Sequence, residues 1–220
     1  MRRTKLIFVT NVAIAVACFG GVASAQSTPY FSATGGMTFP RNLTTDTGVS
    51  GELKDGYAVT GAIGSGFGAI RGEIEASYRR NGVNGASGFG LQLPGTGHAS
   101  ALSAMANAYV DPALDVGPLK PYVGGGVGIS RFRATNVAAV GLPFGGPVTR
   151  FGPISGEKTG FAWQLMAGVG IALSEKAAIT VGYRYFATPS VTVNDVPQFN
   201  SVQVNGLKMH AVEAGLRLGF

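Results

Sequence analysis

The chain has 220 residues, of which 45% are hydrophobic and only 13% are charged, with a formal net charge of +6. A soluble domain normally carries about 25% charged residues, so much of this surface is expected to contact something other than water. After residue 25 no run approaches the ~20 consecutive apolar residues of a membrane-spanning helix. The composition, which includes 35 glycines, therefore argues against an ordinary soluble domain, a helical membrane protein and a disordered chain.

Residues 1–25 are predicted to be a secretory signal peptide. Three basic residues precede an apolar stretch from Leu6 to Phe19, and the small residues after it predict cleavage between Ala25 and Gln26. Loss of those three bases from the 17 Lys and Arg would leave 14 against 11 Asp and Glu. The excess of basic residues is then mild and indicates no nucleic-acid partner.

Cys18, inside this segment, leaves lipoprotein processing open as an alternative. The large aliphatic residue expected three positions earlier is missing, because Ala15 stands there. Cys18 is the only cysteine of the chain. Cleavage after Ala25 would therefore leave a mature domain, residues 26–220, without a disulfide or a thiolate metal site.

The domain 26–220 shows apolar and polar residues alternating with period two, which predicts β-strands. In residues 70–80 the charged side chains Arg71, Glu73, Glu75 and Arg79 all fall on one face. A helix would scatter them around its circumference. The same alternation predicts eight strands, at 30–39, 57–66, 70–80, 100–110, 119–132, 161–173, 178–187 and 207–220.

The predicted connections alternate between long and short along the chain. Short connections lie at 67–69, 111–118 and 174–177. This pattern is typical of an up-and-down meander with tight turns at one end and large loops at the other. The long loops, rich in Gly, Asn, Thr and Pro, are expected at 40–56, 81–99, 133–160 and 188–206, on the outside of the cell.

Alternation alone does not decide whether the apolar faces point into a soluble barrel or outward to lipid. Three features favour a membrane barrel: strands of about the ~9–11 residues that cross a bilayer, an even strand number, and a chain that ends on a strand at Phe220. Aromatic residues near strand ends add an expected interfacial girdle. They are Phe31, Phe39, Tyr57, Phe67, Tyr78, Tyr109, Phe132, Phe161, Trp163, Tyr183, Tyr185 and Phe220.

Several stretches carry a family resemblance: Tyr57–Val59, Gly72–Arg79, Met105–Asp111, Lys120–Gly128, Phe161–Gln164 and the terminal Phe220. In order and spacing they resemble the eight-stranded outer-membrane β-barrel proteins of the opacity-protein and porin-like superfamily of Gram-negative bacteria. The resemblance implies an all-β, eight-stranded antiparallel up-and-down transmembrane β-barrel in the cell outer membrane. It also implies that Phe220 is an assembly signal read by the barrel-assembly machinery, with which periplasmic chaperones cooperate.

If the apolar faces meet lipid, the opposite faces line the lumen. Charges in so narrow a space must pair, because an unpaired buried charge is costly, and glycines at 124, 126, 128, 168 and 170 would make room for them. Two interpretations remain open: a small pore, or a structural plug, which the narrow interior of eight strands favours. The lumen network is predicted to contain Arg71, Glu73, Glu75, Arg79, Lys120, Gln164, Arg184, Glu213 and Arg217.

Catalytic signals are weak. His98 and Ser100 would share a strand face as base and nucleophile, but no acid follows nearby, and Ala101 stands where a lipid A deacylase-like barrel would carry Asn. Gly64–Ala69 loosely matches a dinucleotide-binding pattern without the helix that the pattern requires, so a turn is predicted. His210 is expected near the outer rim of the last strand. We predict no enzymatic activity, no cofactor and no metal site.

The sequence thus predicts an integral outer-membrane barrel with a structural or surface-interaction role, in envelope integrity or in adhesion through its long loops. A small porin-like channel for ions or small solutes is the alternative. Outer-membrane lipids, lipopolysaccharide and a host or cell-surface ligand are the expected partners. Loop 133–160, the longest, is the expected recognition surface.

Overall fold

The computed structural model describes residues 28–44, 50–88, 91–114, 117–141, 149–188, 191–196, 199–204 and 206–220. The predicted signal peptide, with Cys18 and the cleavage site between Ala25 and Gln26, lies outside these residues. Within the described ranges no helix is long and apolar enough to cross a membrane.

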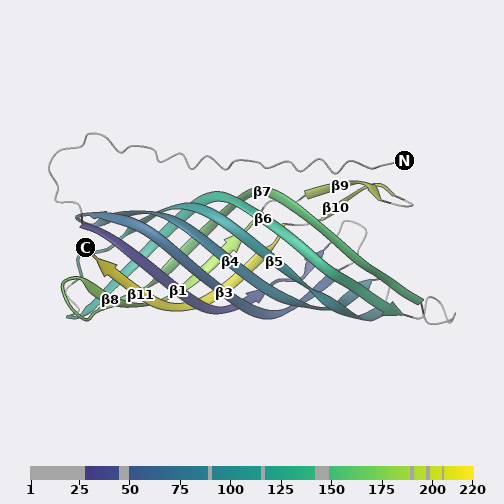
Figure 1. Cartoon of the computed structure of the whole chain (residues 1–220), viewed down its shortest axis with the longest axis horizontal. Helices are drawn as coiled ribbons and strands as arrows, with labels where there is room; N and C mark the ends of the chain where they lie inside the picture. The colour runs from purple at the N-terminus through teal and green to yellow at the C-terminus, as the bar shows by residue number, and fades with distance from the viewer. Residues whose placement is uncertain are drawn as a thin grey trace, which may run out of the picture.

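Eight antiparallel strands form a closed ring, as predicted (Figure 1). The ring closes because β1 pairs with both β3 and β11, so every strand in it has two neighbours. Closure leaves no unpaired sheet edge, which a strand structure in hydrocarbon requires. The strands are β1 (Thr28–Pro40), β3 (Ser50–Phe67), β4 (Ile70–Gly88), β5 (Leu91–Val110), β6 (Leu119–Gly141), β7 (Thr149–Ala172), β8 (Ala177–Ala187) and β11 (Lys208–Gly219).

Short connections gather at one end of the barrel, where the C-terminus also lies (Figure 1). The tightest is a turn at residues 68–69, in which Gly68 has a φ of 65°, a left-handed conformation that favours glycine. At the other end, β2 (Leu43–Thr44) pairs with the start of β3. There too β9 (Val191–Val196) and β10 (Phe199–Val204) form a separate hairpin.

The prediction of loops over 81–99 and 133–160 is wrong for most of their length. β4 pairs with β5 up to Gly88 opposite Leu91, and β6 pairs with β7 over a similar extent. The glycines and asparagines that indicated loops are accommodated at β-bulges, one of them between Gly82 and Gly85. Strand pairing satisfies the backbone hydrogen bonds of these segments, so two long hairpins rise beyond the barrel instead of irregular loops.

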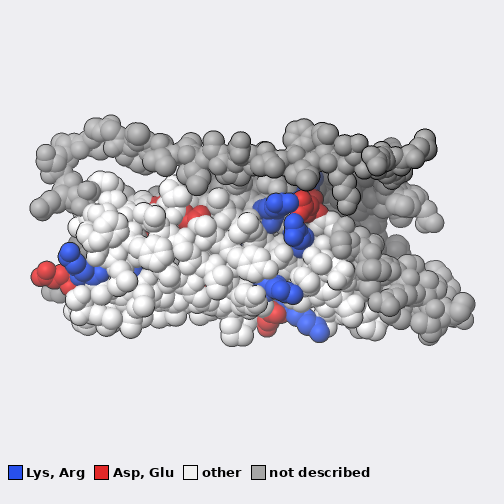
Figure 2. Space-filling view, viewed as in Figure 1, with Lys and Arg blue, Asp and Glu red and all other residues white. Residues whose placement is uncertain are grey.

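The two faces of each strand differ as the alternation predicted. On β4, Ile70 and Ile74 point outward and are 57% and 62% exposed, whereas Arg71 and Glu75 point inward and are 7% and 1% exposed. Figure 2 shows the result, a broad surface without charged residues along the barrel wall. A charged interior within an apolar exterior is the reverse of a soluble barrel and suits a barrel surrounded by lipid.

Candidate functional site: the lumen

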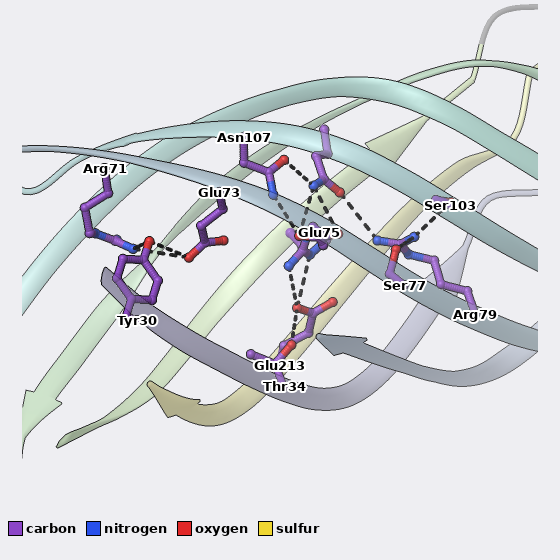
Figure 3. A network of polar contacts seen from close by, with 12 residues as sticks. Tyr30, Thr34, Arg71, Glu73, Glu75, Ser77, Arg79, Ser103, Asn107 and Glu213 are labelled. Atoms are coloured by element: carbon purple, nitrogen blue, oxygen red, sulfur yellow. Dashed lines mark hydrogen bonds and ion pairs between the residues drawn. The ribbon is translucent and has the colours of Figure 1, made fainter. Parts of the chain in front are cut away.

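Strand β4 supplies a row of side chains around which the contacts of the lumen are arranged. Because successive inward side chains lie two residues apart, it places Arg71, Glu73, Glu75, Ser77 and Arg79 in one line along the barrel axis, all of them buried. Figure 3 shows this line and the partners that reach it from other strands. The partners form three clusters.

The first cluster lies near the end with short turns and centres on Arg71. Its guanidinium binds Asp111 through two hydrogen bonds, 2.6 Å from Nε to Oδ2 and 2.9 Å from Nη2 to Oδ1. Tyr30 donates to Glu73 Oε1 at 2.8 Å and accepts from Arg71 at 3.1 Å. The guanidinium also lies 4.5 Å from the ring centroid of Tyr109. An ion pair with two parallel hydrogen bonds, stacked on an aromatic ring, thus fixes the orientation of the Arg71 guanidinium at this end of the lumen.

The second cluster crosses the middle of the lumen and centres on Glu75. Arg184 on β8 donates to both its carboxylate oxygens, at 3.0 and 2.8 Å, and also to Glu213 on β11 at 3.0 Å. Asn107 and Gln164 donate to the same Glu75 carboxylate at 2.9 and 3.3 Å. One arginine therefore bridges two buried carboxylates, the arrangement that compensates for removing all three charges from water.

The third cluster surrounds Arg79, which is 1% exposed. Its guanidinium donates to Ser77 at 2.9 Å and to Gln164 at 3.4 Å, and lies 4.2 Å from the ring centroid of Phe186. Unlike Arg71 and Arg184, it forms no direct ion pair with a carboxylate of the described residues. Arg79 is held by neutral acceptors and an aromatic face.

Beyond Arg79, toward the long hairpins, the interior is largely apolar, with one buried polar pair in which the Asn81 amide donates to the Thr38 hydroxyl at 2.9 Å. Phe186, Met105 and Met209 are the larger members of a buried cluster that also includes Ala162 and Leu207 and packs against Leu53 and Phe132. The pocket left in this region holds about 10 Å³, roughly the minimum for one water molecule. The described side chains thus close the lumen at this level.

Two larger spaces lie on the other side of Arg79, toward the end of the barrel with short turns. A cavity of about 50 Å³ among the first two clusters is lined by Thr60, Arg71 and Glu213 among others, which is room for a few waters. Two buried oxygens in its lining, Thr60 Oγ1 and Glu213 Oε1, lack a hydrogen-bond partner among the described residues. At the mouth, a pocket of about 260 Å³ is lined by both acidic and basic side chains.

Glycines on β6 make the close packing of the lumen possible. A Cβ at Gly126 would collide with Asn107 Oδ1, and one at Gly124 would collide with the ring of Tyr109. On β7, a Cβ at Gly168 would lie 2.5 Å from the hydroxyl of Tyr122. These glycines therefore leave room for particular neighbours on the strands beside them.

The structure brings together Arg71, Glu73, Glu75, Arg79, Gln164, Arg184 and Glu213 of the predicted network. Lys120 is exposed and lines the pocket at the mouth, so it does not join the three clusters. Arg217 is half-buried, 5.6 Å from the ring centroid of Tyr30. Asp111 was missed, although it is the next inward position after Tyr109 in the period-two series.

The aromatic girdle needs two corrections. Tyr109 is 5% exposed and faces the lumen, where it stacks on Arg71. Phe132 packs against the apolar cluster inside the barrel. The nearness of an aromatic residue to a strand end predicts how far along the barrel its ring lies. Whether the ring faces lipid or the lumen depends instead on the position of the residue in the period-two alternation.

The histidines lie apart from the lumen network. His98 and Ser100 are half-buried on β5, next to a register shift between Thr96 and His98. His210 lies on the outer face, where Arg41 donates to its Nε2 at 3.2 Å and Tyr183 contacts its Nδ1. The described residues contain no group of three or more His, Cys, Asp or Glu that could hold a metal.

A closed ring of eight antiparallel strands, apolar outside and charged inside, defines an outer-membrane β-barrel. The chain belongs to the outer membrane protein beta-barrel domain family, whose model matches residues 12–220. Its location is accordingly the outer membrane of a Gram-negative bacterium.

Two relatives illustrate the range of similarity. An uncharacterized protein of Brucella abortus (strain 2308) is 32% identical, in a match that covers 56% of this chain and 48% of the relative. The match thus spans about half the length of that relative. Neisserial surface protein A has a similar fold, with a TM-score of 0.54 and 19% identity over 87% of this chain and 97% of its own.

Proposed function

We propose that this protein is a non-conducting outer-membrane barrel with a structural and surface-interaction role, in which the barrel anchors the long hairpins that contact the envelope, host surfaces or other cells. The observation that carries the proposal is the filled lumen. Ion pairs cross its middle, and Phe186, Met105 and Met209 fill the section above them.

Single-channel recording in planar bilayers tests the closed lumen. The full-length protein is expected to give no stable current steps, because hydrated ions have no continuous path past the apolar cluster. Discrete steps in the wild type that are abolished in Arg71→Ala or Glu73→Ala would overturn the proposal. Arg80→Ala, on the outer wall, is the matched control, since it removes an arginine outside the lumen.

A small channel for ions or small solutes is the second candidate. It is favoured by the cavity of about 50 Å³ and the pocket of about 260 Å³ that follow one another from the mouth. A conducting state would require the apolar cluster to move aside. Conduction that appears only in Phe186→Ala, and not in the wild type, would indicate that this cluster is the barrier.

The surface role is tested by shortening a hairpin. Replacing residues 137–154 of the β6–β7 hairpin by Asn-Gly, a favoured two-residue turn, keeps the barrel strands and removes the longest protruding segment. Attachment of bacteria that carry this variant to host cells or to one another is expected to fall. A shortened β4–β5 hairpin is the control for a general effect of truncation, and unchanged attachment in both would contradict the role.

The proposal includes no catalysis and no nucleic-acid partner. Hydrolysis of lipid A by the pure wild-type protein, lost in His98→Ala, would overturn the proposal that the protein has no catalytic activity.

The partners proposed are outer-membrane lipids and lipopolysaccharide around the wall, a cell-surface ligand at the hairpins, and the chaperones and assembly machinery that insert the barrel. For the assembly step we propose Phe220, which is 71% exposed, as the recognition signal; Phe220→Ala is expected to slow membrane insertion.

A further inference from the structure

On three of the strands the outward face changes from apolar to basic at about the same level. On β1, β4 and β6 the apolar series ends at Phe39, Tyr78 and Ile129, and the next outward positions are Arg41, Arg80 and Arg131. Figure 2 shows blue side chains, with a few red ones beside them, gathered in a band beyond the uncharged wall. We call the exposed bases at this level the basic girdle: Arg41, Lys54, Arg80, Arg131, Arg133 and Lys208.

Aromatic pairs mark the same level independently. The rings of Tyr57 and Tyr78 lie 6.4 Å apart on β3 and β4, and those of Trp163 and Tyr185 lie 5.4 Å apart on β7 and β8. Tyrosine and tryptophan on an outer wall favour the boundary between hydrocarbon and head groups. The basic girdle therefore lies at head-group depth, at the end of the barrel that carries the long hairpins.

On one side of the girdle the protein supplies its own counter-charge. Glu157 accepts from Arg131 at 2.5 Å and from Arg133 at 2.9 Å. These exposed pairs form between adjacent strands β6 and β7. Glu157 therefore neutralises part of the charge of Arg131 and Arg133, which weakens their attraction for an external anion.

On the opposite side, over the consecutive strands β11, β1, β3 and β4, four bases outnumber two acids, the exposed Asp55 beside Lys54 and the half-buried Glu52, which accepts from Asn84. The backbone N–H of Arg41 donates to the carbonyl of Lys208 at 2.9 Å, so two bases lie side by side. The Lys54 side chain lies over Gly82, two residues from Arg80. Within the described part of the chain, none of these four bases forms an ion pair with a carboxylate. Neighbouring like charges repel one another, and an anion bound between them would offset that repulsion.

We propose that Arg41, Lys54, Arg80 and Lys208 form a binding site for the phosphate groups of lipid A in the outer leaflet. Arginine binds phosphate through two parallel hydrogen bonds and lysine as a compact charge, and head-group depth is where a lipid A phosphate lies. This site rests on the proposed function and deepens it, because it names the side chains with which the barrel wall binds the lipopolysaccharide proposed above as its partner.

The test uses the full-length protein folded in detergent and titrated with bisphosphorylated lipid A or with the same lipid A after enzymatic removal of its phosphates. The wild type is expected to prefer the phosphorylated form, with binding that weakens as salt rises from 50 to 300 mM, since exposed charges are screened. Arg41→Gln with Lys208→Gln is expected to weaken binding about 25-fold, at about fivefold for each base removed near an anionic surface. Lys54→Gln with Arg80→Gln is expected to have a similar effect.

The matched control is Lys120→Gln with Lys176→Gln, which removes two exposed bases at the short-turn end and is expected to leave binding within twofold. The heat-dependent shift in gel mobility verifies that each variant is folded. Equal binding of both lipid A forms, wild-type affinity in both girdle variants, or binding of a sulfated glycan without binding of lipid A would overturn the site. None of these results depends on conductance or attachment, so the proposed function and this site fail separately.

Discussion

Arg184 on β8 donates to Glu75 on β4 at 2.8 Å, across the full width of the lumen. In the ring β4 and β8 are four strands apart in either direction, so this pair joins opposite walls. Arg184 also holds Glu213 on β11 at 3.0 Å. Three strands are thus tied together at one level, in addition to the hydrogen bonds that Gln164 on β7 and Tyr30 on β1 form with side chains of β4.

Removing this bridge should be costly. Arg184→Met is expected to lower the free energy of unfolding by about 3–5 kcal/mol, because it leaves the buried carboxylates of Glu75 and Glu213 without their cation. Urea unfolding in lipid vesicles, followed by tryptophan fluorescence, measures the change.

Arg79→Met provides the comparison, since Arg79 is equally buried but forms no direct ion pair with a described carboxylate. Methionine there would pack on Phe186, and the free energy of unfolding is expected to change by at most about 1 kcal/mol. Equal losses in the two variants would show that burial of the charge, and not the bridge, dominates.

The period-two pattern predicts which side chains enter the lumen, and it does so from local sequence alone. Arg71, Glu73, Glu75 and Arg79 alternate with apolar residues over one strand, and a strand has only two faces. The strand order also follows, because alternating short and long connections leave an up-and-down ring as the simple topology.

The partners of these side chains are not predictable in the same way. That Glu75 meets Arg184 depends on the stagger between strands around the closed ring, which no single strand encodes. Asp111 was missed because it lies just after the predicted strand, although the period-two series continued beyond Tyr109 places it on the inward side. The hairpin strands beyond the barrel were missed because glycine and asparagine indicate turns and bulges equally well.

The packing of the lumen predicts opposite effects of alanine at two glycines. Gly126→Ala is expected to cost about 1–3 kcal/mol of stability, because its Cβ would collide with Asn107 and with the carbonyl of Ala106. Gly72→Ala, where nothing lies within 4 Å of the new Cβ, is expected to be neutral or to stabilise by up to about 1 kcal/mol. Urea midpoints measure both, and a loss at Gly72 would contradict the assignment of its face.

The exposed pairs on the β6–β7 hairpin predict a pH response outside the hydrocarbon layer. Hydrogen bonds from Arg131 and then Arg133 lower the pKa of Glu157 below its usual value of 4.5. A lowered pKa in the folded state means that the pairs contribute fully above pH 4.5 and are lost as the pH falls through the lowered pKa.

Carboxyl ¹³C NMR of Glu157 over this range checks the direction, and Arg131→Gln with Arg133→Gln should return the pKa toward 4.5. A wild-type pKa at or above 4.5 would show that the pairs do not persist in solution.

The contacts of His210 predict its tautomer. Arginine has no acceptor, so the hydrogen bond from Arg41 requires Nε2 to accept, and the proton of the neutral ring then lies on Nδ1, directed at the hydroxyl of Tyr183. Imidazole ¹⁵N shifts at neutral pH should report the Nδ1–H form. Arg41→Gln is expected to shift the ring toward a mixture of tautomers, and a pure Nε2–H form in the wild type would contradict the contact.

The β6–β7 hairpin remains paired up to Gly141 opposite Thr149, and this continuity affects how another molecule can recognise the protein. Facing residues come from two antiparallel segments, so any epitope across the hairpin combines positions that are far apart along the chain. A linear peptide copied from one of the two strands would lack half of such an epitope. Antibodies raised against the folded barrel should therefore lose binding on a denaturing blot, even though every residue of their target is still present.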